Sequence, residues 1–299
     1  MGAAAVDLRT VALTLLTLIA FASNSLLTRL ALEPPRIDAA TFTSIRLTAG
    51  AVMLAILVRA QAGSWASLRG RGPAGPLALF VYAVPFSFAY LRIGAAVGAL
   101  VLFGVVQLTM IGYGIARGER PSGVTWLGLV LATGGLATLT VPSATRPDPL
   151  GVLLMAAAGV AWGAYSLVGR TATDPLASNA WSFLCSSPLA ILVNLALSTG
   201  VAASGRGIAL ALISGAVTSG LGYAIWYRAL PRLSVTQAAV AQLSVPVIAA
   251  LGAAVLLGET LTGRFAISAA AVLSGVALAL SARARRGSRV RVPSPDRSG

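Results

Sequence analysis

Long apolar stretches occupy almost the whole chain, and they constrain its fold more than any other feature. A helix needs about 20 consecutive, mostly apolar residues to cross the hydrocarbon core of a bilayer. Ten stretches are predicted to be transmembrane helices: 11–32, 40–58, 76–92, 95–116, 123–141, 150–169, 176–198, 208–228, 234–257 and 263–281. The gaps between them are short, and none can hold a separate soluble domain. The sequence therefore predicts an all-α integral membrane protein with ten transmembrane helices.

The composition excludes other classes of protein. Only 10% of the residues are charged and 57% are hydrophobic, whereas a soluble domain carries roughly 25% charged residues. The chain has no histidine and one cysteine, Cys185, so imidazole chemistry, thiolate metal clusters and an intramolecular disulfide are excluded. An intramembrane enzyme would need a deep catalytic pair, which the spans do not offer. We expect no enzymatic activity, no cofactor and no metal.

The 22 basic residues, all arginine, predict how the chain is oriented. They lie in the short gaps and in the C-terminal segment, so no contiguous basic face exists to bind nucleic acid. With the N-terminus in the cytoplasm, 15 arginines fall inside, six outside and Arg46 within a span. Because cytoplasmic loops carry the excess of arginine, we predict a multi-pass protein of the bacterial inner (plasma) membrane with both termini cytoplasmic.

The two ends of the chain lead to separate predictions. The first stretch contains Asn24 and leads through a Pro-rich turn into another apolar stretch, so we predict a retained helix and not a cleaved signal peptide. Residues 282–299 hold six arginines and one acid, and they predict a basic, disordered cytoplasmic tail. Such a tail can anchor the topology, or it can contact anionic lipid headgroups at about 1 kcal/mol per arginine.

A weak internal repeat divides the chain into two halves. A shift of 140 residues places Gly118 on Gly258 and Glu119 on Glu259, with seven identities over residues 82–120. A shift of 141 lays the first stretch on the sixth. Because each copy would contain five spans, the second copy enters the membrane from the opposite side. Residues 1–141 and 149–281 are thus predicted to be inverted repeats, an architecture typical of secondary transporters with a midplane site.

Five motifs occur in order along both halves. They are SNSLLTRLAL (Ser23–Leu32), TFTSIRLTAGAVML (Thr41–Leu54), GERPSGVTWLGLVLATGG (Gly118–Gly135), AWGAYSLVGR (Ala161–Arg170) and SVPVIAALGAAVLLGETLT (Ser244–Thr262). With these motifs the chain resembles the drug/metabolite transporter superfamily, specifically the EamA-type ten-helix transporters. The resemblance implies two five-helix units, a central cavity, and export or uptake of small metabolites. Pro246 matches a proline that the family often has there, whereas Val106 replaces it in the first half.

Two helical faces are candidates for the cavity wall. Phe21, Asn24 and Ser25 lie on one face of the first stretch, at i, i+3 and i+4, and Trp162 and Tyr165 occupy the corresponding face of the sixth. Trp162 lies near the middle of its span, too deep for an interfacial aromatic belt. Such a face could line a substrate cavity or form a helix–helix contact.

Further polar and aromatic residues complete the predicted binding site. Gln107 and Gln242 lie near the centres of the fourth and ninth stretches, where an amide needs a partner. On the eighth stretch, Trp226 and Tyr227 could instead belong to an interfacial belt. The predicted substrate-binding residues are Asn24, Tyr82, Tyr90, Gln107, Trp162, Tyr165, Tyr223, Trp226 and Gln242.

Three charged residues are candidates for a role in charge recognition or coupling. Arg46 lies about 8 Å along the axis of its span at 1.5 Å per residue, so it could act in transport, or it could reach the outer interface or cap carbonyls of the first helix. Glu119 and Glu259 could couple ions to transport, or they could bind backbone N–H groups at the start of the next helix.

The function that these features favour is a secondary transporter or facilitator. It would move small amphipathic metabolites across the cytoplasmic membrane by alternating access, with amino-acid-like solutes and export favoured. A zwitterionic or cationic solute is expected, because Arg46 is placed shallower than the cavity. The alternatives are an importer of a sugar, a carboxylate or a nucleotide-like solute, and a non-transporting membrane scaffold. Assembly into a homodimer is left open.

Overall fold

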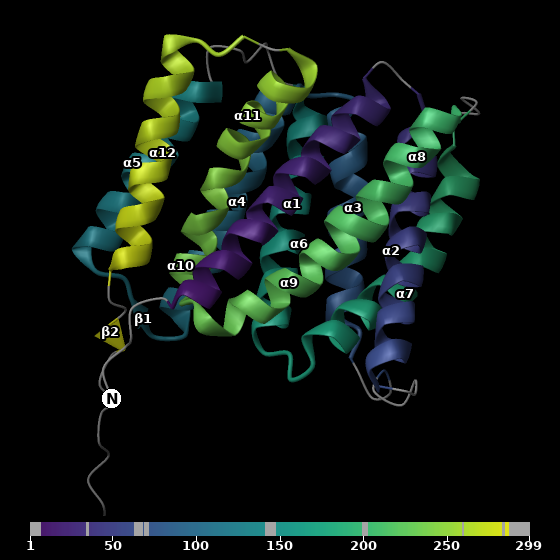
Figure 1. Cartoon of the computed structure of the whole chain (residues 1–299), viewed down its shortest axis with the longest axis horizontal. Helices are drawn as coiled ribbons and strands as arrows, with labels where there is room; N and C mark the ends of the chain where they lie inside the picture. The colour runs from purple at the N-terminus through teal and green to yellow at the C-terminus, as the bar shows by residue number, and fades with distance from the viewer. Residues whose placement is uncertain are drawn as a thin grey trace, which may run out of the picture.

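The computed structural model describes residues 7–33, 36–62, 68, 72–140, 148–198, 203–258, 260–282 and 285–286. This part of the chain is a bundle of long helices (Figure 1). The α-helices are α1 (Leu8–Leu32), α2 (Ala39–Ala62), α3 (Ala74–Tyr90), α4 (Ala95–Ala116), α5 (Gly123–Thr140), α6 (Pro149–Arg170), α7 (Pro175–Leu197), α8 (Gly205–Ile213), α9 (Gly222–Ala229), α10 (Val235–Ala241), α11 (Val245–Leu257) and α12 (Gly263–Ser281). Two short strands, β1 (Glu119–Arg120) and β2 (Arg285–Arg286), pair antiparallel.

Within the described ranges, nine helical runs are long and apolar enough to cross a membrane. The third predicted span is a shorter apolar helix, α3, of 17 residues. The protein is therefore an integral membrane helical protein, with nine spanning candidates where the sequence predicts ten.

The outer surface of the bundle is apolar and much of its polar content is inside. Leu108 is 76% exposed and Val255 83% exposed, whereas Asn24 and Gln242 are buried. This distribution suits a protein whose surroundings are lipid, because hydrocarbon solvates leucine and cannot satisfy an amide.

Two of the helical runs are interrupted near their middles. The eighth consists of α8, a π-helical segment η3 (Ser214–Leu221) and α9, followed by the 3-10 turn η4 (Leu230–Arg232). The ninth is divided between α10 and α11 by the 3-10 turn η5 (Gln242–Ser244), with Pro246 in the first turn of α11. A proline there lacks the N–H that would continue the helix. α4, which has Val106 at the corresponding place, is continuous.

The turns that follow α4 and α11 share one backbone feature. Gly118 and Gly258 have φ angles of +87° and +70°. Glycine adopts this left-handed conformation without the steric cost that a Cβ imposes. The two Gly-Glu turns that the sequence repeat aligns therefore have a glycine in the same conformation.

Helices of the two halves pack against each other throughout the bundle. α5 lies along α12 at one edge of Figure 1, and α2 lies along α7 at the other. Between them, α3 packs on α6 and α1 packs on α9, while α4 contacts α6 and α1 contacts α11. The pairs are symmetric between the halves. When each helix is replaced by its counterpart in the other half, α3 on α6 becomes α9 on α1, and α4 on α6 becomes α11 on α1.

The pair formed by α5 and α12 depends on glycine. A Cβ built on Gly128 would lie 2.5 Å from the carbonyl oxygen of Gly275, and one on Gly275 would lie 2.5 Å from that of Gly128. Small residues allow membrane helices to approach this closely, and van der Waals packing then holds them together. Gly134, also on α5, has nothing within 4 Å of its built Cβ.

Replacing Gly128 by alanine should destabilise the protein by about 1–3 kcal/mol, the usual cost of overpacking. The matched substitution Gly134→Ala should be neutral or slightly stabilising, since alanine favours helix over glycine by about 1 kcal/mol. Thermal unfolding of the two purified variants in detergent measures the difference. Equal transition temperatures would show that the close approach of α5 and α12 does not contribute to stability.

Candidate functional site

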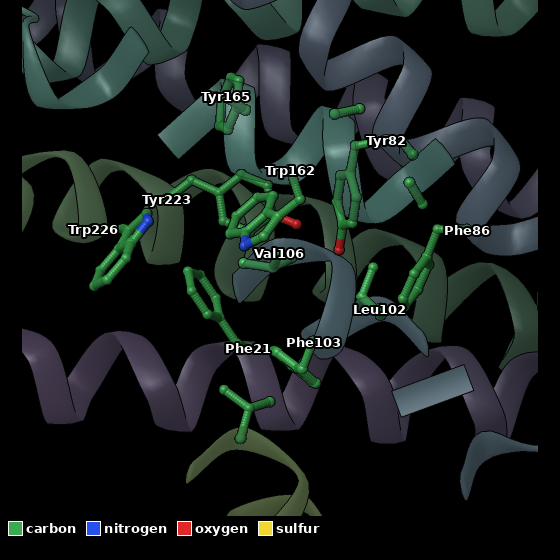
Figure 2. Close-up of a cluster of buried hydrophobic side chains, with 14 of the residues drawn as sticks. Phe21, Tyr82, Phe86, Leu102, Phe103, Val106, Trp162, Tyr165, Tyr223 and Trp226 are labelled. Atoms are coloured by element: carbon green, nitrogen blue, oxygen red, sulfur yellow. The ribbon is translucent and has the colours of Figure 1, made fainter. Parts of the chain in front are cut away.

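Aromatic rings from four helical runs meet at the centre of the bundle (Figure 2). The Trp162 ring lies 5.0 Å from Phe21, 4.8 Å from Tyr223 and 4.8 Å from Tyr82, measured between centroids. The contacts with Phe21 and Tyr223 are edge-on, a geometry that ring quadrupoles favour. Phe21 is on α1, Tyr82 on α3, Trp162 on α6 and Tyr223 on α9, so both halves contribute to the cluster.

A small cavity lies within this cluster. Its volume is about 20 Å³, roughly the room that one water molecule needs. The cavity is lined by Phe21, Asn24, Ser25, Tyr82, Phe86, Leu102, Phe103, Trp162, Tyr223 and Val245. The walls come from α1, α3, α4, α6, α9 and α11, and they are mainly aromatic.

Asn24 joins α1 to the π-helical segment. Its side-chain Oδ1 accepts hydrogen bonds from the hydroxyls of Ser214 at 2.7 Å, Thr218 at 3.3 Å and Ser219 at 3.4 Å. The sequence analysis did not identify these hydroxyls. A spacing of i and i+4 places Ser214 and Thr218 on one face of an α-helix, whereas Ser219 joins them because the segment is π-helical. The buried amide therefore has polar partners from the other half of the chain.

Trp162 and Gln242 form a second buried polar contact. The Trp162 indole Nε1–H donates to Gln242 Oε1 at 2.6 Å, and Gln242 Nε2 donates to the carbonyl of Ala238 at 3.1 Å. Gln242 begins the 3-10 turn that interrupts the ninth run. The contact thus holds a ring of the cavity wall against a broken helix.

The Arg46 side chain is more completely buried than its position in the sequence predicts. The residue is fully buried, which corrects the expectation that it reaches an interface. Its Nε donates to Ser219 Oγ at 2.9 Å and its Nη2 donates to the Tyr223 hydroxyl at 2.6 Å. The guanidinium carbon lies 5.7 Å and 5.8 Å from the centroids of the Tyr82 and Phe86 rings.

A close backbone contact brings Arg46 to this position. A Cβ built on Gly215 of η3 would lie 2.1 Å from the carbonyl oxygen of Arg46. Only glycine permits that approach of α2 to η3. Arg46 lies on the second helix, as predicted, but its long side chain runs inward to η3 and α9 instead of outward.

Glu119 binds a helix N-terminus, although not the one that the sequence predicts. Its Oε1 accepts from the Val235 backbone N–H at 2.8 Å, and its Oε2 accepts from the Thr236 N–H at 3.2 Å and the Thr236 hydroxyl at 3.0 Å. These groups begin α10, in the other half of the chain. The next helix, α5, is capped by Ser122, which accepts from the Thr125 N–H at 3.2 Å. Glu259 lies outside the described residues.

The remaining candidates lie in the same buried region but not on the cavity wall. Gln107 donates from Nε2 to the carbonyl of Ala239 at 2.7 Å, and its Oε1 has no partner among the described residues. Tyr165 donates its hydroxyl to Asn179, a residue that sequence analysis did not single out. Trp226 donates to Ser166 at 3.1 Å, and the Tyr90 ring lies tilted against the Phe86 ring, with a centroid distance of 4.9 Å and an interplanar angle of 59°.

Trp226 and Tyr227 do not form an interfacial belt. Both side chains are fully buried. Tyr227 donates its hydroxyl to the carbonyl of Tyr165 at 3.1 Å. Because the Trp226 ring packs against Phe21 of α1 and the Tyr227 ring against Tyr165 of α6, the interpretation of this pair as belt residues is wrong.

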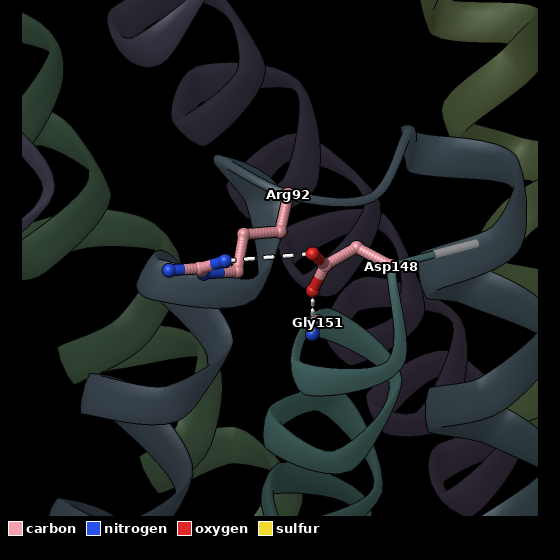
Figure 3. A network of polar contacts seen from close by, with 3 residues as sticks. All are labelled: Arg92, Asp148 and Gly151. Carbon is pink, nitrogen blue, oxygen red and sulfur yellow. Dashed lines mark hydrogen bonds and ion pairs between the residues drawn. The ribbon is translucent and has the colours of Figure 1, made fainter.

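A polar contact near one end of the bundle joins the loop after α3 to the start of α6 (Figure 3). Arg92 Nη1 lies 3.5 Å from Asp148 Oδ2, and Asp148 Oδ1 accepts from the Gly151 N–H at 2.7 Å. The two charged side chains are 46% and 39% exposed. An ion pair this exposed contributes little to stability, whereas the cap satisfies a first-turn N–H of α6.

The fold and the buried cavity define a multi-pass helical membrane protein with an internal polar and aromatic site. Residues 149–281 match the family model of the EamA-like transporter family. A protein of Pseudomonas aeruginosa described as uncharacterized is 50% identical over 290 residues, which cover 95% of this chain and 98% of that protein. A solved crystal structure with 23% sequence identity has the same fold, with a TM-score of 0.75 over 88% of this chain and 96% of that one.

The chain belongs to the EamA-like transporter family, within the drug/metabolite transporter superfamily. This confirms the resemblance that the sequence motifs show. Members of this family are membrane transporters of small solutes, not enzymes.

Removal of the Glu119 carboxylate should loosen the start of α10. We expect Glu119→Ala to cost about 1 kcal/mol, as the loss of a cap does, and to speed hydrogen exchange at residues 235–237 roughly fivefold. Ser122→Ala is the matched control, and it should speed exchange at the start of α5 only. Unchanged protection at 235–237 in the Glu119 variant would refute this link between the halves.

Proposed function

We propose that the protein is a secondary transporter or facilitator that moves small amphipathic metabolites by alternating access. The observation that carries the proposal is the buried cavity between α1, α3, α4, α6, α9 and α11, walled by rings and amides from both halves. Small-molecule sites combine an apolar wall with a few placed polar groups. In a membrane bundle, polar side chains at such a depth are costly and mark solute pathways.

The architecture that we propose is ten transmembrane helices in two inverted five-helix repeats, residues 1–141 and 149–281. Two features support it: the packing pairs are preserved when the halves are exchanged, and Gly118 and Gly258 have the same left-handed conformation. In this arrangement α3 is counted as a short spanning helix. Inverted repeats place the solute site at their interface near the midplane.

Alternating access requires helices that can bend. The interrupted eighth and ninth runs supply two such places, at η3 and at η5 beside Pro246. Discontinuous helices next to the solute site are a recurring feature of secondary transporters. We propose that these segments flex while the paired helices α5 and α12 stay together.

We further propose that the protein resides in the bacterial inner membrane with both termini cytoplasmic. The excess of arginine on that side supports this orientation. Residues 287–299 of the basic tail lie outside the described ranges, and contact with anionic lipid is proposed for them from charge alone.

The solutes we favour are amino-acid-like, and the direction we favour is export. The buried guanidinium of Arg46 argues against a cationic solute, which corrects that part of the sequence analysis. The Arg46 guanidinium suits a solute that carries an acidic group. A carboxylate, one of the solutes considered for import, is such a solute. Import and a non-transporting scaffold are outcomes that a flux measurement separates from export.

Uptake into proteoliposomes against a panel of amino acids and related metabolites, with and without a pH gradient, tests the proposal. Trp162→Phe keeps an aromatic ring at this place, although a smaller one, and removes the indole N–H that donates to Gln242. Such a hydrogen bond contributes about 1 kcal/mol. Flux of the transported solute should fall roughly fivefold or more in Trp162→Phe and in Asn24→Ala.

Two exposed residues on helices that line the cavity serve as controls for the site variants. Val160 on α6 and Leu108 on α4 face outward, so Val160→Ala and Leu108→Ala should transport like wild type. A wild-type protein that moves no member of the panel in either direction would favour the scaffold. Normal flux in both site variants would show that the cluster is only packing.

A further inference from the structure

We propose that Arg46 binds the carboxylate of the transported solute, and that this solute joins one carboxylate to an apolar or aromatic body. The inference rests on the proposed function, because it assumes that solute enters the central cavity. It names the chemical group that the site recognises and the residue that recognises it.

Arg46 has no counter-charge among the described residues. Arg46 is fully buried, and within the described ranges no carboxylate forms an ion pair with it. Its neighbours Ser219, Tyr82, Phe86 and Tyr223 are neutral hydroxyl and ring groups. A buried charge is normally paired, because desolvation costs several kcal/mol per ion. An ionisable residue within a membrane segment is by default a candidate functional residue.

One donor of the Arg46 guanidinium is unused within the described ranges. A guanidinium presents five N–H donors in a planar fork. Nε and Nη2 donate to Ser219 and Tyr223, whereas Nη1 is buried and has no hydrogen-bond partner among the described residues. A carboxylate supplies both the charge and the acceptor oxygens that this arrangement lacks. Arginine binds carboxylates with charge-assisted hydrogen bonds that are stronger than neutral ones.

Arg46 also lies next to the central cavity. Tyr82, Phe86 and Tyr223 contact the guanidinium and also line the central cavity. The guanidinium therefore lies directly behind the cavity wall, and only these rings and hydroxyls stand between it and the cavity. A solute in an enlarged cavity would reach Arg46 without crossing another layer of helices.

The wall of the cavity defines the rest of the solute. Phe21, Trp162 and Phe103 present ring surfaces, and no acidic residue is among the lining residues. An apolar or aromatic body fits these surfaces. An ammonium group, where the solute has one, would find ring faces and the Asn24 amide and no carboxylate.

A purely structural role for Arg46 makes the opposite prediction about the protein without solute. If Arg46 only braces α2 against η3 and α9, its removal should destabilise the empty protein. If it awaits an external counter-charge, Arg46→Gln removes an uncompensated buried charge, and the empty protein should be as stable as wild type or more so. The stability of the empty protein therefore separates the two roles.

The experiment compares matched carboxylates and amides as stabilisers of the purified protein. The probes are phenylalanine and phenylalaninamide, and 3-phenylpropanoate and 3-phenylpropanamide, with chloride and sulfate as simple anions. A ligand that binds the folded state raises the transition temperature, and the rise grows with the logarithm of the ratio of its concentration to its Kd. We expect each carboxylate to stabilise wild type at concentrations at least tenfold below its amide. Arg46→Gln should abolish that preference, and Arg59→Gln, an exposed arginine on α2, should retain it.

Four results would overturn the inference. They are equal stabilisation of wild type by carboxylates and amides, stabilisation by chloride or sulfate equal to that by the carboxylates, a retained preference in Arg46→Gln, and an empty Arg46→Gln protein less stable than wild type. The wild-type comparison of carboxylates with amides needs no variant, and an Arg46→Gln protein that does not fold counts as the fourth of these results. Carboxylate binding through Arg46 without flux in proteoliposomes would uphold the carboxylate site at Arg46 and refute the proposed transport function. Flux without a carboxylate preference would do the reverse.

Discussion

The centre of this bundle is organised around the Arg46 guanidinium, which is buried away from water and from any described carboxylate. Hydrocarbon cannot solvate the charge, so the surrounding helices must supply partners. Ser219 and Tyr223 provide two hydrogen bonds, and the Tyr82 and Phe86 rings provide their faces. These contacts come from α3, η3 and α9 while Arg46 is on α2. Side chains from both halves therefore meet at the charge, beside the cavity.

The helices can meet there only because of local backbone features. Gly215 lets η3 touch the backbone of Arg46, and the π-helical turn orients Ser214, Thr218 and Ser219 toward Asn24. Single π-helical turns are frequent at functional sites. At the same time the broken ninth run presents Gln242 to Trp162. Irregular backbone is tolerated at membrane depth when it is buried in protein, and here it adjoins the cavity.

The sequence predicts the helices well, because the length of an apolar run is a one-dimensional property. The predicted stretch 95–116 coincides with α4 (Ala95–Ala116). Helical periodicity likewise places Phe21, Asn24 and Trp162 near the centre. The sequence fails where the answer depends on distant partners. The apolar run places Arg46 on the second helix but does not give the direction of its long side chain. Glu119 binds an N-terminus 116 residues away, which no local pattern reveals.

The central claim is that Arg46 lacks a counter-charge that the solute supplies, and an internal carboxylate tests it most directly. Ser219 Oγ lies 2.9 Å from Arg46 Nε, so Ser219→Asp would place a carboxylate beside the guanidinium. Its matched control is Ser219→Asn, which has the same shape without the charge. The account predicts that Ser219→Asp unfolds at a higher temperature than Ser219→Asn and is no longer stabilised by added 3-phenylpropanoate. An aspartate variant that is less stable than the asparagine variant and still responds to the carboxylate would contradict the account.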